Sequence, residues 1–160
     1  MTAAVTVNLG LPALRPAELG IEAGGDDFIA REIELFGERG KVSCVGFDCT
    51  HCVFYVADAG KFDIEFVGEG ISAIEYFPDD IETDFTQVRD EENLIVRAWR
   101  SGREIRRGVY AAAAAFTAAL AEGKCGDKCT VHLEKGKVTA EWTDSGVKIA
   151  GPFELVYALS

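Results

Sequence analysis

Residues 108–122 read GVYAAAAAFTAALAE, and this stretch decides the fold. No charged residue lies between Arg107 and Glu122, and alanine is the strongest helix former. We therefore predict a helix that ends near Gly123. Its apolar side chains cover the whole circumference, so the rest of the domain must enclose it. At 1.5 Å per residue the helix is about 21 Å long, enough to thread one small domain.

The remainder of the chain is predicted to form mainly strands and turns. Alternating apolar residues bounded by glycine, proline and aspartate are typical of strands. We expect strands at 5–9, 28–36, 41–46, 52–56, 83–88, 94–99, 129–133, 138–143, 147–149 and 153–158. Residues 13–27 are expected to be a loop, 37–40 a turn, and 66–77 a second helix that stops before Pro78. The predicted class is α+β, with a mixed, mostly antiparallel, barrel-like sheet around a central alanine-rich helix in one domain, 1–160.

Composition excludes several classes of partner. The 160 residues include 16 basic and 27 acidic ones, which gives a net charge of −11. This charge disfavours nucleic acid and anionic membranes as partners. No segment approaches the roughly 18 to 20 apolar residues of a membrane span. The N-terminus lacks a basic stretch followed by an apolar run, so we expect no signal peptide and a cytoplasmic protein.

Five cysteines, at 44, 49, 52, 125 and 129, leave two interpretations open. The odd count in a cytoplasmic protein indicates reduced thiols. Alternatively, Cys49-x-x-Cys52 and Cys125-x-x-x-Cys129 could form a structural zinc site together with His51 and His132. Our first interpretation is that no metal is bound.

Six further motifs flank the alanine-rich helix in a characteristic order. They are VTVNLGLP (5–12), THCVFYV (50–56), FPDDIETDFTQV (77–88), IVRAWRSGRE (95–104), CTVHL (129–133) and GVKIAGPFELVY (146–157). This series resembles the C-terminal half of the diaminopimelate epimerase family, the cofactor-independent amino-acid epimerases and racemases. The likeness covers almost the whole chain, and the closing motif is its most specific part.

The resemblance implies a mechanism that needs two halves and no cofactor. Members of the family have two halves related by a pseudo-twofold axis, with the active site in the cleft between them. Each half supplies a cysteine at the start of its central helix. One thiolate removes the α-proton, and the other thiol returns a proton on the opposite face. A helix N-terminus lowers the pKa of a thiol and offers free amides to the substrate carboxylate.

This chain departs from the family at the reactive position. The family has a Glu-Thr-x-x-Cys-Gly-Thr-Gly-like run before the alanines, and on that spacing the cysteine is replaced by Gly108. Val109 and Tyr110 replace two small residues, although the free main-chain amides should persist. Glu104 matches the family's glutamate, which helps to bind the substrate amino group. Its alternative role is that of a surface carboxylate paired with neighbouring arginines.

Two more positions differ around a histidine. The family's Gly-Asn-Pro-His turn reads Asp48-Cys49-Thr50-His51 here, so Cys49 replaces a substrate-contacting asparagine. A second such asparagine is replaced by Glu82. His51 is either inherited from the active site or a hydrogen-bonded structural residue. Cys49 could also act as a relocated thiol assisted by His51.

We therefore expect an epimerase-like isomerase domain that binds a small amino-acid-like ligand, with activity doubtful because of Gly108. The candidate catalytic residues are Glu104 and His51, and the candidate ligand-binding residues are Cys49, Glu82, Gly108, Val109 and Tyr110. One alternative is a non-catalytic binding or assembly module of the same fold. Another is an isomerase that moves a proton with Glu104 and His51. The expected partner is a second copy or a matching N-terminal half, supplied separately or by a longer chain.

Overall fold

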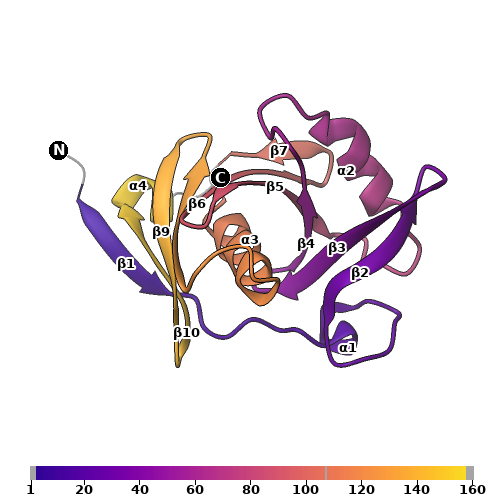
Figure 1. The fold of residues 1–160 in the computed structure, drawn as a ribbon, viewed down its shortest axis with the longest axis horizontal. Helices are drawn as coiled ribbons and strands as arrows, with labels where there is room; N and C mark the ends of the chain where they lie inside the picture. Colours follow the sequence, from indigo (N-terminus) through magenta and orange to yellow (C-terminus); the bar gives the residue numbers. More distant parts are fainter. Residues whose placement is uncertain (1–2, 107, 158–160) are drawn as a thin grey trace.

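One curved sheet surrounds helix α3 (Val109–Ala121) in the computed structural model, which describes residues 3–106 and 108–157 (Figure 1). The strands of this part are β1 (Ala4–Asn8), β2 (Phe28–Leu35), β3 (Glu38–Gly46), β4 (Thr50–Tyr55), β5 (Glu82–Asp90), β6 (Asn93–Arg100), β7 (Arg103–Ile105), β8 (Lys128–Leu133), β9 (Gly136–Thr143) and β10 (Gly146–Pro152). They follow the order β1-β10-β9-β8-β6-β5-β4-β3-β2, and β7 pairs with β6. The pairs β4–β5 and β6–β8 are parallel and the others antiparallel, so the predicted α+β class is confirmed.

Helix α3 is buried along almost its whole length. Each residue from Ala111 to Ala119 is at most 5% exposed. The helix contacts β3, β4, β5, β6, β8, β9 and β10, which curve around it. Alanine side chains let all these strands approach the helix closely, because they add little beyond the backbone. The prediction of an enclosed helix is confirmed.

A second layer covers the outer face of β3–β6. Helix α2 (Ile64–Ser72) begins at Asp63, whose carboxylate accepts a hydrogen bond from the Phe66 amide at 3.1 Å. It packs closely on β6, since a β-carbon added at Gly68 would lie 2.6 Å from the Trp99 ring. The helix is shorter than the predicted 66–77. After Ser72 the chain turns, which places Phe77 edge-on against Phe28 at a centroid distance of 5.8 Å.

Three further local predictions need correction. The predicted loop 13–27 contains a one-turn helix, α1 (Pro16–Leu19), which starts on a proline and ends at a left-handed Gly20. The β2–β3 turn has two residues with positive φ, Phe36 and Gly37, as in type I′ turns, instead of the predicted four. Residues 153–158 were expected to form a strand, but α4 (Phe153–Val156) stands there, and Ala158 lies outside the described residues.

The last correction has a physical cause in the sheet. Strand β10 pairs with β1 only as far as Ala4↔Pro152, so no partner remains for a longer strand. The consecutive residues Leu155 and Val156 are both buried, which a helical turn allows and strand alternation does not. Nowhere in the described ranges is there a helix with the length and apolarity needed to cross a membrane.

Candidate functional site

The predicted site residues fall into two groups, one with Gly108 at the start of α3 and one with His51 on β4. Gly108 is the N-cap residue of the helix, and no side chain caps the helix there. The Tyr110 ring lies 6.5 Å from the Phe47 ring, which places the loop after β3 beside the first helical turn. That loop leads into β4, the strand that carries His51.

His51 occupies the interior of the sheet. It pairs in register with Glu82, and Val53 pairs with Asp84 on the same two parallel strands. Residues two apart on a strand face the same side. Val53 packs on Ala114 and Ala118 of α3, so the His51 side chain also faces the central helix. The ring is fully buried.

Three carboxylates surround this ring. His51 Nε2 lies 2.7 Å from Asp48 Oδ1, and Nδ1 lies 2.7 Å from Asp84 Oδ2. Glu82 Oε2 is 3.1 Å from the same Nδ1. Because both ring nitrogens face carboxylate oxygens, the ring is held as an imidazolium that donates in both directions. Burial lowers the pKa of His51, but attraction to Asp84 and its hydrogen bonds with Asp48 and Asp84 outweigh this, so the pKa lies well above its usual value.

The acceptors in this cluster outnumber the donors. Nδ1 carries a single hydrogen, which goes to Asp84. With both carboxyl groups ionised, the buried Glu82 Oε2 and Asp84 Oδ1 have no hydrogen-bond donor, whereas a proton on Asp84 would join the two side chains. Burial and repulsion from Glu82 raise the pKa of Asp84 well above its usual value. For Glu82 burial acts in the same direction, but contact with His51 outweighs it and lowers the pKa. We call His51, Glu82 and Asp84 the interior cluster.

Cys49 lies at the outer side of this cluster. Its Sγ is 3.7 Å from His51 Nε2, so the thiol and the imidazole meet as predicted. The thiol is half-buried, and burial raises its pKa. Cys49 also lines an open hollow of about 380 Å³ together with Phe47, Asp48 and Thr50. Asp48 has a second charged neighbour here, because its Oδ2 lies 3.8 Å from Arg100.

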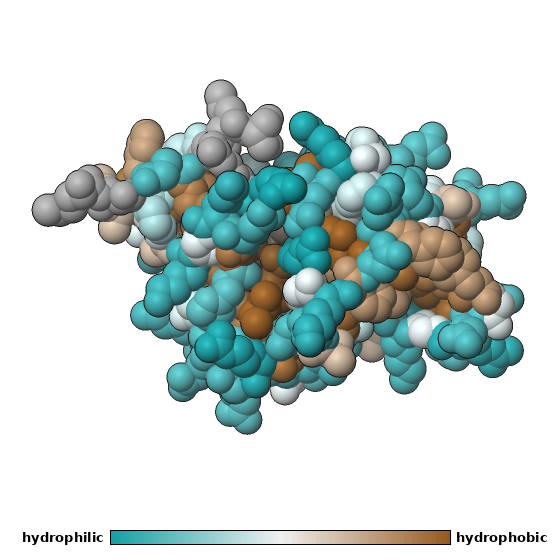
Figure 2. Space-filling model, turned by 90° about the horizontal axis from the view of Figure 1, so that it is seen from above, coloured by the Kyte–Doolittle hydropathy of each residue, from teal (hydrophilic) through white to brown (hydrophobic). Residues whose placement is uncertain are grey.

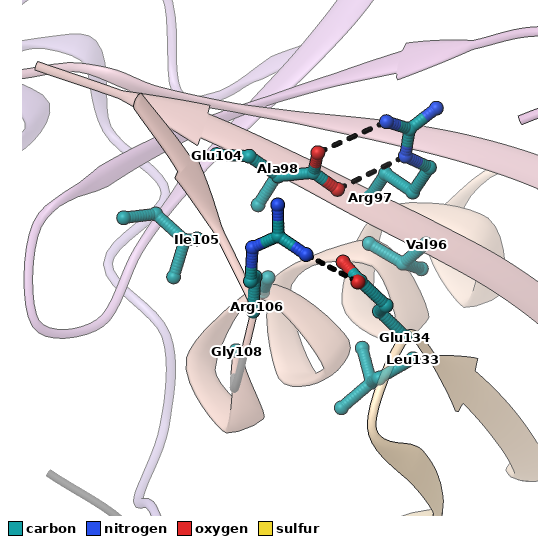
Figure 3. Close-up of a pocket in the computed structure, with 10 residues that line it drawn as sticks. Val96, Arg97, Ala98, Glu104, Ile105, Arg106, Gly108, Leu133 and Glu134 are labelled. Atoms are coloured by element: carbon teal, nitrogen blue, oxygen red, sulfur yellow. Dashed lines mark hydrogen bonds and ion pairs between the residues drawn. The ribbon is translucent and has the colours of Figure 1, made fainter. Parts of the chain in front are cut away.

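Glu104 belongs to a different cluster, which it forms with Arg97 (Figure 3). Val96 and Ala98 of β6 face the core around α3, so Arg97 between them lies on the outer face of that strand. Its carboxylate accepts two hydrogen bonds from Arg97, at 3.0 and 2.9 Å, and Arg97 also donates to the Ala59 carbonyl at 2.9 Å. The hydrogen bond from Arg97 lowers the pKa of Glu104. Next to this pair Arg106 donates to Glu134, and both pairs line an open hollow of about 440 Å³.

The start of α3 forms one wall of a recess beside Glu104. Gly108 lines this recess together with Glu104, Arg106 and Glu134. A β-carbon at position 108 would lie 2.9 Å from the Ala111 β-carbon, so even the smallest side chain requires a shift there. The Val109 side chain is buried, while Tyr110 is 37% exposed. Arg107 lies outside the described residues.

The structure thus brings together only some of the predicted residues. His51, Glu82 and Cys49 share one cluster, as described above. Glu104 and Gly108 share the recess, and in the described ranges no contact joins Glu104 to His51. Three partners were missed by sequence reasoning, namely Asp48, Asp84 and Arg97. Asp84 had a usable signal, since it lies on the predicted strand 83–88 two residues after Glu82, and residues two apart share a face if the strand includes Glu82, as β5 does.

The alternative of a four-cysteine zinc site has no support in this arrangement. Cys52 and Cys44 lie in the hydrophobic cluster that includes Ile71 of α2, whereas Cys125 and Cys129 lie in the core around α3. Two groups of potential metal ligands occur in the described residues, Asp48–Cys49–His51 and His51–Glu82–Asp84. Neither includes Cys52, Cys125, Cys129 or His132.

Comparison with known proteins agrees with the motif series. No family model matches the chain. The chain is 33% identical over 154 residues to a diaminopimelate epimerase of Moorella thermoacetica, which covers 94% of this chain and 55% of that protein. It is 31% identical over 158 residues to a diaminopimelate epimerase of Microcystis aeruginosa, and the match covers 96% of this chain and 56% of that protein. It is 30% identical over 157 residues to a diaminopimelate epimerase of Leptospira biflexa, and the match covers 96% of this chain and 56% of that protein.

The coverage is as informative as the identity. Each match extends over nearly all of this chain, so it does not depend on one shared motif. The chain spans about half the length of the curated relatives it matches. It is therefore a half-length relative of the diaminopimelate epimerases, consistent with their C-terminal half.

Proposed function

We propose that this epimerase-like domain binds a small amino-acid-like ligand at the start of α3 and does not epimerise it unaided. The observation that carries the proposal is the position of Gly108, which begins the buried helix and lines a narrow recess with Glu104. The recess itself is too small for a ligand, so the ligand would occupy the adjoining hollow of about 440 Å³, which Glu104 also lines. The relatives are named diaminopimelate epimerases, so a zwitterionic amino acid is the ligand class to test first.

The helix start supplies the anion-binding part of the proposed site. The first amides of a helix have no intrahelical acceptor, and α3 has no side-chain cap that takes up any of them. Such amides, together with the helix dipole, favour a carboxylate. Tyr110 is partly exposed beside them and would contact the ligand.

Glu104 supplies the matching negative charge, but only in part. An ammonium group favours a carboxylate partner, and Glu104 is one of the two carboxylates that line the recess with Gly108. Because Arg97 already donates two hydrogen bonds to it, a ligand must share this carboxylate with the guanidinium. We expect weak binding for this reason.

Position 108 argues against proton transfer by the chain itself. Glycine has no side chain that could transfer a proton. A cysteine at this position would place its β-carbon against the Ala111 side chain. In this first candidate, the reacting proton comes from another chain. We propose that a second copy, or a separate N-terminal half, covers this end of the domain and completes the cleft. In the second-copy case the domain would serve as a binding or assembly module.

Two measurements on the same protein test this proposal. Thermal unfolding with diaminopimelate, and with other amino acids as a series, should show stabilisation that grows with ligand concentration. Nuclear magnetic resonance in deuterated solvent should show no exchange of the α-proton. Glu104→Gln should weaken the stabilisation, whereas Asp90→Asn, an exposed carboxylate on β5, should not. Stabilisation by no amino acid at millimolar concentration would contradict ligand binding, and catalytic exchange would contradict inactivity.

One contact favours a second candidate, in which Cys49 moves a proton. Its Sγ lies 3.7 Å from His51 Nε2 and faces an open hollow. A neighbouring imidazole can assist a thiol in proton transfer. Burial works against this role, since it raises the pKa of the thiol. If the chain does exchange the α-proton, Cys49→Ser should abolish the exchange, and a variant that still exchanges would exclude Cys49.

A further inference from the structure

We propose that the interior cluster binds one divalent transition-metal ion of the zinc class, held by His51 Nδ1 and by the carboxylates of Glu82 and Asp84. One ligand atom from each of the three side chains lies within 4.8 Å of the other two. All three side chains are more than nine-tenths buried. This site is independent of the proposed amino-acid ligand, which binds on the Glu104 side of the helix start.

Two orphan oxygens are the first argument for a missing cation. Glu82 Oε2 and Asp84 Oδ1 are buried without a hydrogen-bond partner, and both belong to side chains that face His51. A buried carboxylate oxygen without a donor is costly, and it calls for a proton or a metal ion. A metal ion between Nδ1 and the two carboxylates would satisfy both residues at once.

Charge balance is the second argument. Two buried carboxyl groups face one imidazole ring, and Asp48 adds a third at the other ring nitrogen. A divalent ion with two carboxylates and a neutral imidazole has no net charge. Binding must displace the Nδ1 proton, which is released to the solvent along with any proton shared by the two carboxylates. Imidazole and carboxylate ligands together favour zinc, iron or manganese over calcium and magnesium.

Asp48 gives the third argument, because it fixes the ring for this role. Its Oδ1 accepts the Nε2 hydrogen at 2.7 Å, which leaves Nδ1 as the free ligand nitrogen once its proton is gone. A carboxylate on the far nitrogen is the usual support of a metal-bound histidine. The present 2.7 Å between Nδ1 and Asp84 Oδ2 is a hydrogen-bond distance. Ligands of a tetrahedral zinc ion lie roughly 3.3 Å apart, so binding moves the carboxylates outward by less than 1 Å.

The other side of the ring offers a competing group, which the experiment must separate. Asp48, Cys49 and His51 Nε2 could also hold an ion, and that group contains a sulfur. The interior cluster is favoured because both orphan oxygens lie there and Nε2 already has a carboxylate partner. A thiolate ligand gives Co²⁺ an intense charge-transfer absorption that oxygen and nitrogen ligands do not give.

The test is cobalt binding during refolding, since the cluster is buried. The full chain is unfolded with a chelator, desalted and refolded with Co²⁺ or Zn²⁺. We expect one ion per chain, visible Co²⁺ absorption without a thiolate band, release of protons, and a higher melting temperature that a chelator reverses. Absence of both a Co²⁺ spectrum and stabilisation by Zn²⁺ would overturn the proposal and leave a shared proton as the partner of the orphan oxygens.

Variants locate the ion. Glu82→Gln and Asp84→Asn should each abolish the spectrum, and Asp48→Asn should weaken affinity about 10- to 100-fold. Cys49→Ser and Asp90→Asn should leave the spectrum unchanged, with Asp90 as a carboxylate on the same strand as Asp84. Circular dichroism confirms that each variant folds. A thiolate band that Cys49→Ser removes would place the ion on the outer side of His51 and would also overturn the proposal.

Discussion

Two clusters of charged side chains differ in how their acidic groups are matched by basic groups. On the outer face of β6 and β7, Glu104 is matched by Arg97 through two hydrogen bonds, and both side chains are partly exposed. In the interior cluster, two carboxylates share one imidazolium and leave two oxygens without a donor. The outer cluster has one cation for each carboxylate, while the interior cluster has a single imidazolium for its two acidic side chains.

This difference predicts that the two clusters respond differently to substitution. A matched pair at the surface contributes little to stability and is easily replaced. A buried group of like charges is a cost that selection has no reason to keep for stability alone. The first two predictions concern the interior cluster, where substitutions should change the free energy of unfolding most.

The largest effect is expected for His51→Ala, measured by urea unfolding in the presence of a chelator. Removing the imidazolium leaves Glu82 and Asp84 buried with no cation, and breaking a buried pair in this way costs about 3–5 kcal/mol. His132→Ala is the matched control. Its ring is partly exposed and meets Asn93 Oδ1 at 2.9 Å, so the loss should stay below about 1 kcal/mol. Equal losses of unfolding free energy in the two variants would contradict the view that His51 neutralises buried charge in the interior cluster.

Glu82→Gln should act in the opposite direction when no metal is present. The amide removes one negative charge next to Asp84 and provides a donor for an orphan oxygen. Because a buried unsatisfied group costs about 1–3 kcal/mol, we expect a gain of about 1 kcal/mol in the free energy of unfolding. Glu104→Gln, which removes a matched carboxylate, should cause a loss. A loss for both variants would mean that Glu82 is already satisfied by a proton.

The contrast also explains which parts of the structure could be predicted from sequence. Helix α3 and the strands of the sheet follow from local signals, an uncharged alanine run and alternation between turn residues. The prediction of a strand after Pro152 was wrong because the end of β10 depends on where β1 begins, about 150 residues away along the chain. The early end of α2 likewise depends on the contact between Phe77 and Phe28.

The site shows the same limit more strongly. The family resemblance assigns His51, Glu82 and Cys49 to one site, and in the structure Glu82 and Cys49 each contact His51. The spacing of Asp84 from Glu82 indicates a shared face, but its contact with His51 follows only from the register of β4 on β5, and Asp48 looks like an ordinary turn residue. Arg97 was missed for a related reason, since its pairing with Glu104 depends on the short strand β7 folding back on β6.

On the outer cluster, Glu104→Gln should lower stability at neutral pH by up to about 1 kcal/mol, the range of partly exposed ion pairs. The hydrogen bond from Arg97 lowers the pKa of Glu104 in the folded state. Its contribution is therefore present above the unfolded value of 4.5 and is lost as the pH falls through the lower, folded pKa. Unfolding curves of the parent and the variant should converge below pH 4.5. A difference that widens in acid would contradict the Arg97 pairing.

The smallest effect is expected for Arg106→Gln, which removes the pair with Glu134 beside the same recess. The two side chains are 56% and 38% exposed, so water competes for both charges, and the change in stability should stay within about 0.5 kcal/mol. Any such change should vanish in 1 M salt, where the Debye length is about 3 Å. The His51→Ala loss should persist in the same salt, because ions do not screen a buried cluster well. If salt removed both effects equally, the interior cluster would be as hydrated as the surface pair.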